Sequence, residues 1–368
     1  MSEAPIPTRR KRLGRVGLVL GSTLLSLVLA EGVYRIVHAE QPDDGQADDA
    51  WRQRISRMNH TIYRRSDDAR LVYEPRPSSS VEMEYGSAAF NAAGMRDDRE
   101  QPRDFAGPRI ALLGDSVAWG EHLALESSLG RRLEADARQP VLSFGVSGYD
   151  TAQEALWYER AVRPFHARTV LVVYCLNDVL IMSGPYNAWG TRADEQRKDA
   201  QTAWLDRVAP LRAETLDAVA EREARDAVWK SFARLHALLR EATYERSARY
   251  TDELLLAYAD TARVRRMRES LRALGSAIHA DGASAQLVIS PVHRAWDTYH
   301  WEAIHRLVAG SARAAGFTVH DPLPRWRGEY RPEDLRIDSL HFGEHGTRVL
   351  AKYLAEQLAA SEEPHAEH

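Results

Sequence analysis

The sequence predicts an α/β fold: a three-layer sandwich in which helices cover both faces of a central parallel sheet. From residue 109 onward, short apolar runs alternate with helix-like stretches. Such alternation is typical of a parallel sheet, because a parallel strand returns to its sheet through a crossover helix. Polar or glycine-containing loops directly follow several of these runs, at the carboxyl edge where open α/β sheets bind ligands.

The individual elements can be placed from their hydrophobic patterns. Five buried strands are expected at residues 109–114, 141–144, 169–174, 285–290 and 317–320. Helices are expected at residues 122–137, 151–163, 262–280, 298–315 and 344–360. Residues 190–260 break the alternation, because they hold no strand-like run and are rich in Arg, Glu and Ala. We interpret them as a helical insertion that either caps the active site or forms a solvated or partner-binding surface.

The first 40 residues predict a targeting segment. Basic residues cluster at positions 9–15, and residues 16–30 carry no charge. Extending this apolar stretch to position 37 gives a helix long enough for the roughly 30 Å hydrocarbon core of a bilayer. We interpret residues 1–12 as a cytoplasmic tail and residues 13–37 as an inner-membrane anchor, so that the rest of the chain lies on the periplasmic or extracellular side. A signal peptide cleaved near position 39 is the alternative.

Residues 38–108 are predicted to form a tether and then an irregular segment against the main domain, which we place at residues 109–360. Pro, Gly and Asn are frequent in its second half, and Asn91 and Arg96 are expected to pin it to the domain. Cys175 is the only cysteine, which excludes an internal disulfide. The net charge of −4, with basic clustering only at the N-terminus, gives no case for nucleic-acid binding.

Candidate chemistry falls in the loops after the predicted strands. Ser116 follows the first strand in GDS, Gly148 follows the second in GVSGYD, and Asn177 follows the third in ND. Asp338 and His341 form a D-x-x-H motif before the final helix. A serine hydroxyl becomes a nucleophile when a base takes its proton, and a carboxylate orients that base. The order of these residues therefore predicts a serine esterase site.

These motifs, in this order, resemble the SGNH (GDSL) hydrolase superfamily over residues 109–358, less the insertion. The N-terminal anchor and the NAAGMR segment resemble a bacterial membrane-anchored subgroup. The resemblance implies a flavodoxin-like fold, with Ser116 as the nucleophile, His341 as the base and Asp338 as its carboxylate. No cofactor is expected.

The resemblance also implies an oxyanion hole. Its donors would be the backbone N–H groups of Ser116 and Gly148 and the side chain of Asn177. Two positions depart from the family pattern: Cys175 stands where a glycine is usual, and GDSL reads GDSV. No metal is expected from His341 and His345, since the zinc motif needs Glu directly after the first His.

Four further residues are candidates for substrate binding. Trp119, Tyr149 and Trp189 fall in or near the loops of the active edge, and aromatic faces can stack on sugar rings. His293 follows the fourth strand and could touch substrate. Simple packing of the aromatic residues, and surface polarity for His293, are the alternatives.

The resulting hypothesis is a membrane-tethered serine esterase that acts through an acyl-enzyme on O-acyl esters, for example acetyl esters. Its location outside the cytoplasm points to envelope or extracellular carbohydrate as the ester-bearing partner, with the lipid bilayer as the partner of the N-terminal helix. Three alternatives stay open: an O-acyltransferase with the same triad, a lipid esterase or thioesterase, and a non-catalytic envelope protein that binds through the cleft or the insertion.

Overall fold

A computed structural model describes residues 61–180 and 254–362, except positions 69 and 295. All of these belong to the compact unit Ser56–His368. Its central sheet consists of β5 (Ile110–Gly114), β6 (Val141–Ser143), β7 (Thr169–Cys175), β8 (Ser284–Ser290) and β9 (Thr318–His320). The strands lie in the order β6-β5-β7-β8-β9, and every neighbouring pair is parallel. The five predicted strands and the flavodoxin-like order are therefore confirmed.

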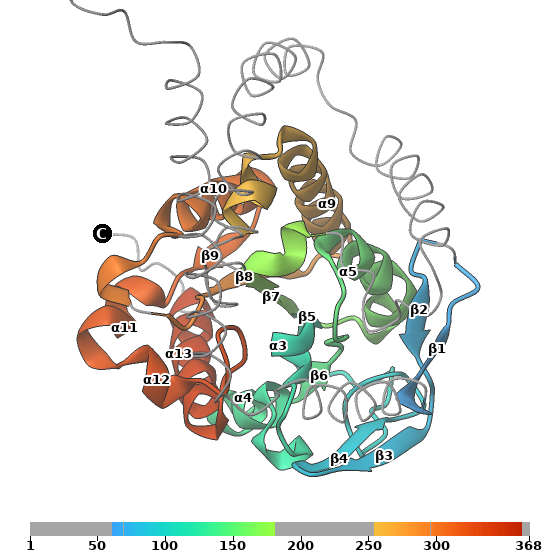
Figure 1. Cartoon of the computed structure of the whole chain (residues 1–368). Coiled ribbons are helices and arrows are strands. Elements are labelled where there is room, and N and C mark those ends of the chain that lie inside the picture. The colour runs from blue at the N-terminus through green and yellow to red at the C-terminus, as the bar shows by residue number, and fades with distance from the viewer. Residues whose placement is uncertain (1–60, 69, 181–253, 295, 363–368) are drawn as a thin grey trace, which may run out of the picture. The chain divides into compact units, whose positions relative to one another are not determined.

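Helices cover both faces of this sheet (Figure 1). On one face, α4 (Leu129–Ala137) packs against α13 (Glu344–Glu362). On the other, α9 (Thr261–Ala280) packs against both α5 (Thr151–Trp157) and α10 (Glu302–Ala314). The central strand β7 is buried along its whole length, as expected for a strand covered from both sides. This arrangement is the predicted three-layer sandwich.

The segment before the sheet differs from the prediction. It forms two antiparallel pairs, β1 (Tyr63–Arg65) with β2 (Tyr73–Pro75) and β3 (Ser79–Met83) with β4 (Gly86–Phe90). The prediction of an irregular segment missed these strands, because strands of three to five residues leave little periodicity to detect. Residues 91–108 contain no helix or strand, as predicted. Figure 1 shows these strands, in blue, beside the α/β layers.

Short helices fill the connections. They are α3 (Ser116–Trp119), η1 (Leu125–Ser127), η2 (Tyr158–Val162), η3 (Arg163–Phe165), η4 (Leu176–Val179), η6 (Trp296–Thr298), α11 (Leu323–Glu329) and α12 (Pro332–Leu335).

The predicted anchor at residues 13–37 lies outside the described residues. So does the predicted insertion, except for its last residues, of which 254–259 are helical. Within the ranges that are described, no helix combines the length and the apolar character needed to cross a bilayer.

Candidate active site

Ser116 is the first residue of α3, directly after strand β5. Asp115 caps this helix, because its carboxylate accepts a hydrogen bond from the N–H of Val117 at 2.9 Å. Burial raises the pKa of Asp115, although the bond from Val117 opposes the rise. Ser116 itself is 8% exposed. The turn between β5 and α3 thus holds the Ser116 hydroxyl at the carboxyl edge of the sheet.

His341 and Asp338 come from the C-terminal part of the domain and lie beside Ser116. His341 Nε2 lies 2.9 Å from Ser116 Oγ, although the two residues are 225 positions apart. His341 Nδ1 lies 2.8 Å from Asp338 Oδ2. The structure therefore brings together the three residues predicted from the sequence, with the imidazole of His341 between the hydroxyl of Ser116 and the carboxylate of Asp338.

The D-x-x-H turn orients its own carboxylate. Asp338 Oδ1 accepts hydrogen bonds from the backbone N–H groups of Leu340 and His341, each at 2.8 Å. Burial would raise the pKa of Asp338, but the bonds from His341 and the turn outweigh it and hold that pKa well below its usual range. Burial would likewise lower the pKa of His341, and the hydrogen bond and charge of Asp338 raise it instead. Asp338 is thus an ionised carboxylate, and its charge makes the imidazole of His341 more basic.

The loop that carries His341 is fixed to the end of strand β8. The N–H of His293 donates to the carbonyl of Ser339 at 2.8 Å, and Arg336 Nη1 donates to the carbonyl of His293 at 2.7 Å. Arg336 and Phe342 also form an isolated antiparallel bridge around the turn. These contacts fix the loop, and therefore the position of His341, independently of the hydrogen bonds that the His341 side chain makes.

The loop after β6 lies against the nucleophile helix. A Cβ at Gly145 would lie 2.4 Å from the backbone nitrogen of Trp119, so only glycine fits there. Three residues later, Gly148 has φ of +80°, a left-handed conformation that also favours glycine. Gly145 therefore allows the close approach of this loop to α3, and Gly148 allows its left-handed turn.

The N-terminal segment clamps the same loop. Tyr73 donates its hydroxyl to the carbonyl of Ser147 at 2.7 Å. The N–H of Ser147 donates to the hydroxyl of Tyr63 at 3.2 Å. Both backbone groups of the residue before Gly148 are thus held by the strand pair β1–β2. Sequence analysis missed this contribution.

Asn177 approaches from the end of β7, in the turn η4. It is 6% exposed, and its buried Oδ1 atom has no hydrogen-bond partner among the described residues. The nearby amide of Asn177 lowers the pKa of Asp115, against the larger effect of burial. The amide group therefore lies beside the residue that precedes the nucleophile. Ser116, Gly148 and Asn177 thus follow the adjacent strands β5, β6 and β7.

Arg96 supports helix α3, which begins at Ser116. It is 2% exposed, and its guanidinium donates to the carbonyl oxygens of Trp119, Gly120 and Leu123. The guanidinium carbon also lies 4.0 Å from the centroid of the Trp119 ring. Burial lowers the pKa of Arg96 to about 10, so it stays charged at neutral pH. Arg96 therefore pins its segment to the domain as expected, through contacts with helix α3 and the residues that follow it.

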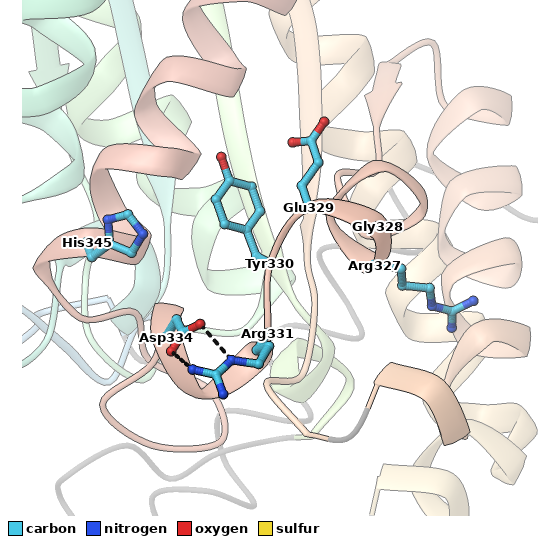
Figure 2. A pocket seen from close by; sticks show the side chains of 7 residues that line it. All are labelled: Arg327, Gly328, Glu329, Tyr330, Arg331, Asp334 and His345. Atoms are coloured by element: carbon cyan, nitrogen blue, oxygen red, sulfur yellow. Dashed lines mark hydrogen bonds and ion pairs between the residues drawn. The ribbon is translucent and has the colours of Figure 1, made fainter.

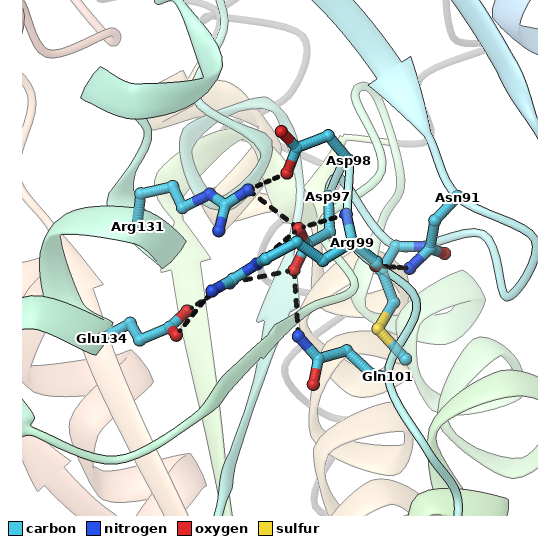
Figure 3. A network of polar contacts seen from close by, with 8 residues as sticks. Asn91, Asp97, Asp98, Arg99, Gln101, Arg131 and Glu134 are labelled. Atoms are coloured by element: carbon cyan, nitrogen blue, oxygen red, sulfur yellow. Dashed lines mark hydrogen bonds and ion pairs between the residues drawn. The ribbon is translucent and has the colours of Figure 1, made fainter.

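A polar network fastens the same segment to helix α4 (Figure 3). Arg131 pairs with Asp97 at 2.9 Å, and Arg99 pairs with Glu134 at 2.7 Å. Asn91 donates to the carbonyl of Arg99 at 2.8 Å, which closes the turn. The side-chain hydrogen bonds of Asn91 thus shape the segment itself, and the contacts to helix α4 come from Asp97 and Arg99 instead.

Three of the predicted substrate-binding residues are buried. Trp119 and His293 are fully buried and Tyr149 is 2% exposed, so their side chains do not face a substrate. Trp119 packs under Arg96, the hydroxyl of Tyr149 is bonded inside the domain, and burial lowers the pKa of His293 to about 3. These predictions were wrong, because proximity in sequence to an active loop does not decide which way a side chain points. Trp189 lies outside the described residues.

The site contains a second histidine that sequence analysis missed. The ring of His122 lies 5.4 Å from that of His341, at 81°. The ring of Tyr85 lies 6.1 Å from His122 in another edge-to-face contact. Ligand atoms of His122, Asp338 and His341 lie within 4.8 Å of one another, so these residues could hold a metal ion. The only signal for His122 in the sequence is its position three residues after helix α3.

His345, the second histidine of the HFGEH motif, lines a different hollow (Figure 2). This pocket of about 720 Å³ lies at α11 and α12 and does not include the triad. Arg331 and Asp334 form an ion pair at 2.9 Å in its wall. The side chain of Tyr330 points away from this pair, between His345 and Glu329. The remaining lining residues are Arg327, Gly328 and Glu329.

Comparison with known proteins gives similarities in solved structures alone. No protein-family model matches the sequence, and no curated protein matches it. A structure of a G-D-S-L family lipolytic protein from Desulfitobacterium hafniense is 9% identical, with a TM-score of 0.38, and covers 68% of this chain and 99% of its own.

Two other similar structures carry related descriptions. A lipase/acylhydrolase from Enterococcus faecalis is 13% identical, with a TM-score of 0.40, covering 71% of this chain and 100% of its own. Axe2, an acetylxylan esterase from Geobacillus stearothermophilus, is 13% identical, with a TM-score of 0.39, covering 70% and 96%. At these identities and TM-scores, the likeness assigns neither an activity nor a substrate.

Proposed function

We propose that this protein is a serine ester hydrolase of the SGNH type, acting through an acyl-enzyme on Ser116. The observation that carries the proposal is the continuous path from Ser116 Oγ to His341 Nε2 at 2.9 Å, and from His341 Nδ1 to Asp338 Oδ2 at 2.8 Å. These are hydrogen-bond distances of the kind that nucleophilic catalysis needs.

The mechanism follows from the protonation states. His341 accepts the hydroxyl proton as Ser116 Oγ attacks the ester carbonyl, and Asp338 stabilises the resulting imidazolium. The tetrahedral intermediate then collapses, the alcohol leaves with the proton from His341, and an acyl group remains on Ser116. Water, activated by the same imidazole, adds to the acyl carbonyl and releases the acid. No cofactor enters these steps.

The negative charge on the carbonyl oxygen needs fixed donors. We assign this role to the N–H groups of Ser116 and Gly148 and to the amide of Asn177. Support comes from their positions after three adjacent strands and from the glycine contact that packs the Gly148 loop on α3. Each such donor typically stabilises the transition state by about 3–4 kcal/mol.

The proposed substrates are O-acyl esters, for example acetyl esters, of envelope or extracellular carbohydrate. The predicted anchor at residues 13–37 supports this, because it would hold the domain at the outer face of the inner membrane. Since Trp119 and Tyr149 are buried, stacking of those rings on sugars no longer supports the choice. The substrate class therefore rests on the predicted location.

A substrate panel tests this proposal. The full chain and Ser116→Ala would be compared on short-chain nitrophenyl esters, acetylated xylo-oligosaccharides, lysophospholipids and acyl thioesters. Ser116-dependent release of acetate from the oligosaccharide is expected. Preference for a lipid or thioester would replace the substrate class and keep the mechanism. Transfer of the acyl group to an added sugar, in place of water, would indicate an O-acyltransferase. No Ser116-dependent turnover on any ester would contradict the proposal.

A further inference from the structure

His122, Asp338 and His341 bring two imidazoles and one carboxylate together beside the nucleophile. One ligand atom of each residue lies within 4.8 Å of those of the other two. We propose that these three residues form a binding site for a divalent transition-metal ion such as Zn²⁺, and that occupation of the site switches the hydrolase off.

The donor set suits this class of ion. Two imidazole nitrogens and one carboxylate oxygen are the ligands of three-residue zinc sites, in which a water molecule completes the tetrahedron. Bonds of about 2.1 Å at tetrahedral angles place ligand atoms about 3.4 Å apart. Asp338 Oδ2 and His341 Nδ1 are 2.8 Å apart, and a ring nitrogen of His122 lies within 4.8 Å of the ligand atoms of both residues. Small side-chain rotations would therefore bring the three atoms to the spacing of a zinc site.

The backbone holds His122 ready for this role. His122 has φ of +64°, a left-handed conformation that is uncommon for residues other than glycine and often marks a functional position. Tyr85, in the connection between β3 and β4, also packs edge-to-face against the His122 ring.

An ion can reach the site from solvent. The side chain of Asp338 is 47% exposed, and His122 is half-buried. A carboxylate at the surface with two imidazoles behind it offers a route of entry without movement of the sheet.

Metal binding would disable the base by changing the tautomer of His341. The active ring carries its proton on Nδ1, facing Asp338, and keeps the Nε2 lone pair for Ser116. An ion on Nδ1 displaces that proton, and the neutral ring then carries a proton on Nε2, so its proton count is unchanged. Nε2 can no longer accept the proton of Ser116. The inhibition rests on the proposed function, whereas the binding does not.

Zinc inhibition of the full-length protein tests the switch. Ester hydrolysis would be titrated with Zn²⁺ after chelator treatment, and reversed with EDTA. His122→Asn and His122→Gly remove the ligand while accepting the left-handed backbone. His166→Asn is the matched control, because His166 is an exposed histidine that also has positive φ, at 49°. Each variant is compared with its own metal-free rate.

The expected result is that the half-inhibitory Zn²⁺ concentration rises about tenfold or more in both His122 variants and stays unchanged in His166→Asn. Near-UV circular dichroism would establish that each variant is folded. Equal zinc sensitivity in the original chain and a folded His122 variant would overturn the proposal.

Binding is measured separately from turnover with Co²⁺, whose visible absorption reports tetrahedral nitrogen and oxygen ligands. In Ser116→Ala, one equivalent of Co²⁺ should give these bands, and the double variant with His122→Asn should lose them. Because Ser116→Ala needs no activity, this arm stands even if the proposed function fails. Absence of the bands in folded Ser116→Ala would contradict the site.

Discussion

The guanidinium of Arg96 lies 4.0 Å from the ring centroid of Trp119 and donates to the carbonyl of the same residue. It also donates to the carbonyls of Gly120 and Leu123, just beyond the helix that begins at Ser116. Arg96 belongs to the segment before the sheet, outside the predicted hydrolase domain. The nucleophile helix is therefore completed by a residue that the α/β layers do not supply.

Arg96→Met should destabilise the domain and slow the attack by Ser116. The substitution leaves buried carbonyl oxygens without a donor, at a cost of about 1–3 kcal/mol for each unsatisfied group. We expect a clear loss of thermal stability and a slower reaction with a fluorophosphonate probe. Arg103→Met is the matched control, because Arg103 is exposed in the same segment. Equal stability of the two variants would show that the buried contacts of Arg96 do not matter.

Tyr73→Phe should loosen the loop that carries Gly148. It removes the 2.7 Å bond from the Tyr73 hydroxyl to the carbonyl of Ser147, worth about 1 kcal/mol of unfolding free energy. Because the oxyanion donor would be less well placed, kcat should fall by roughly three- to tenfold with little change in KM. Tyr330→Phe, at the separate pocket of Figure 2, provides the comparison. An unchanged kcat for Tyr73→Phe would show that the hydrogen bond from Tyr73 to Ser147 does not contribute to catalysis.

Asn177→Ala should reduce kcat by about 10²–10³, as loss of one oxyanion donor typically does. The effect should appear in kcat more than in KM, because the oxyanion exists only beyond the ground state. Steady-state kinetics on a short-chain ester measures it, with a thermal melt to detect loss of folding. A decrease below tenfold would remove Asn177 from the oxyanion hole.

Asp338→Asn should shift the pH dependence of kcat/KM. His341 must be neutral to accept the proton of Ser116, so the rate rises as pH passes the pKa of His341. Burial lowers that pKa, and the hydrogen bond and charge of Asp338 more than offset it. Without the charge the pKa falls, so the rising limb should move to lower pH while kcat drops by roughly 10²–10⁴. A rising limb that stays at the same pH in Asp338→Asn would contradict the pairing of Asp338 with His341.

Much of the fold was predictable because the sheet is buried on both faces. A strand such as β7, buried along its whole length, appears in sequence as an unbroken apolar run. Helix α9 likewise shows its inward face as a regular pattern from Val264 to Ile278. The short pairs β1–β2 and β3–β4 carry no comparable signal, since their stability comes from contacts with distant residues.

The triad was predictable for a different reason. Asp338 and His341 share one turn, and the strand order places that turn at the same edge as Ser116. The failures at Trp119 and His293 concern side-chain direction, which depends on what packs beneath each loop. Arg96 buries the first, and the ring of Phe342, 4.3 Å away between centroids, packs on the second. Such contacts are tertiary, and no local pattern encodes them.

The most direct test of the central claim is intact-mass analysis of the full chain after treatment with a fluorophosphonate. This reagent phosphonylates only a serine whose hydroxyl is activated by a neighbouring base. We predict one adduct per chain, mapped by peptide sequencing to Ser116, absent in Ser116→Ala and strongly slowed in His341→Ala. Labelling of folded protein at another residue, or at Ser116 with the same rate in His341→Ala, would contradict the account.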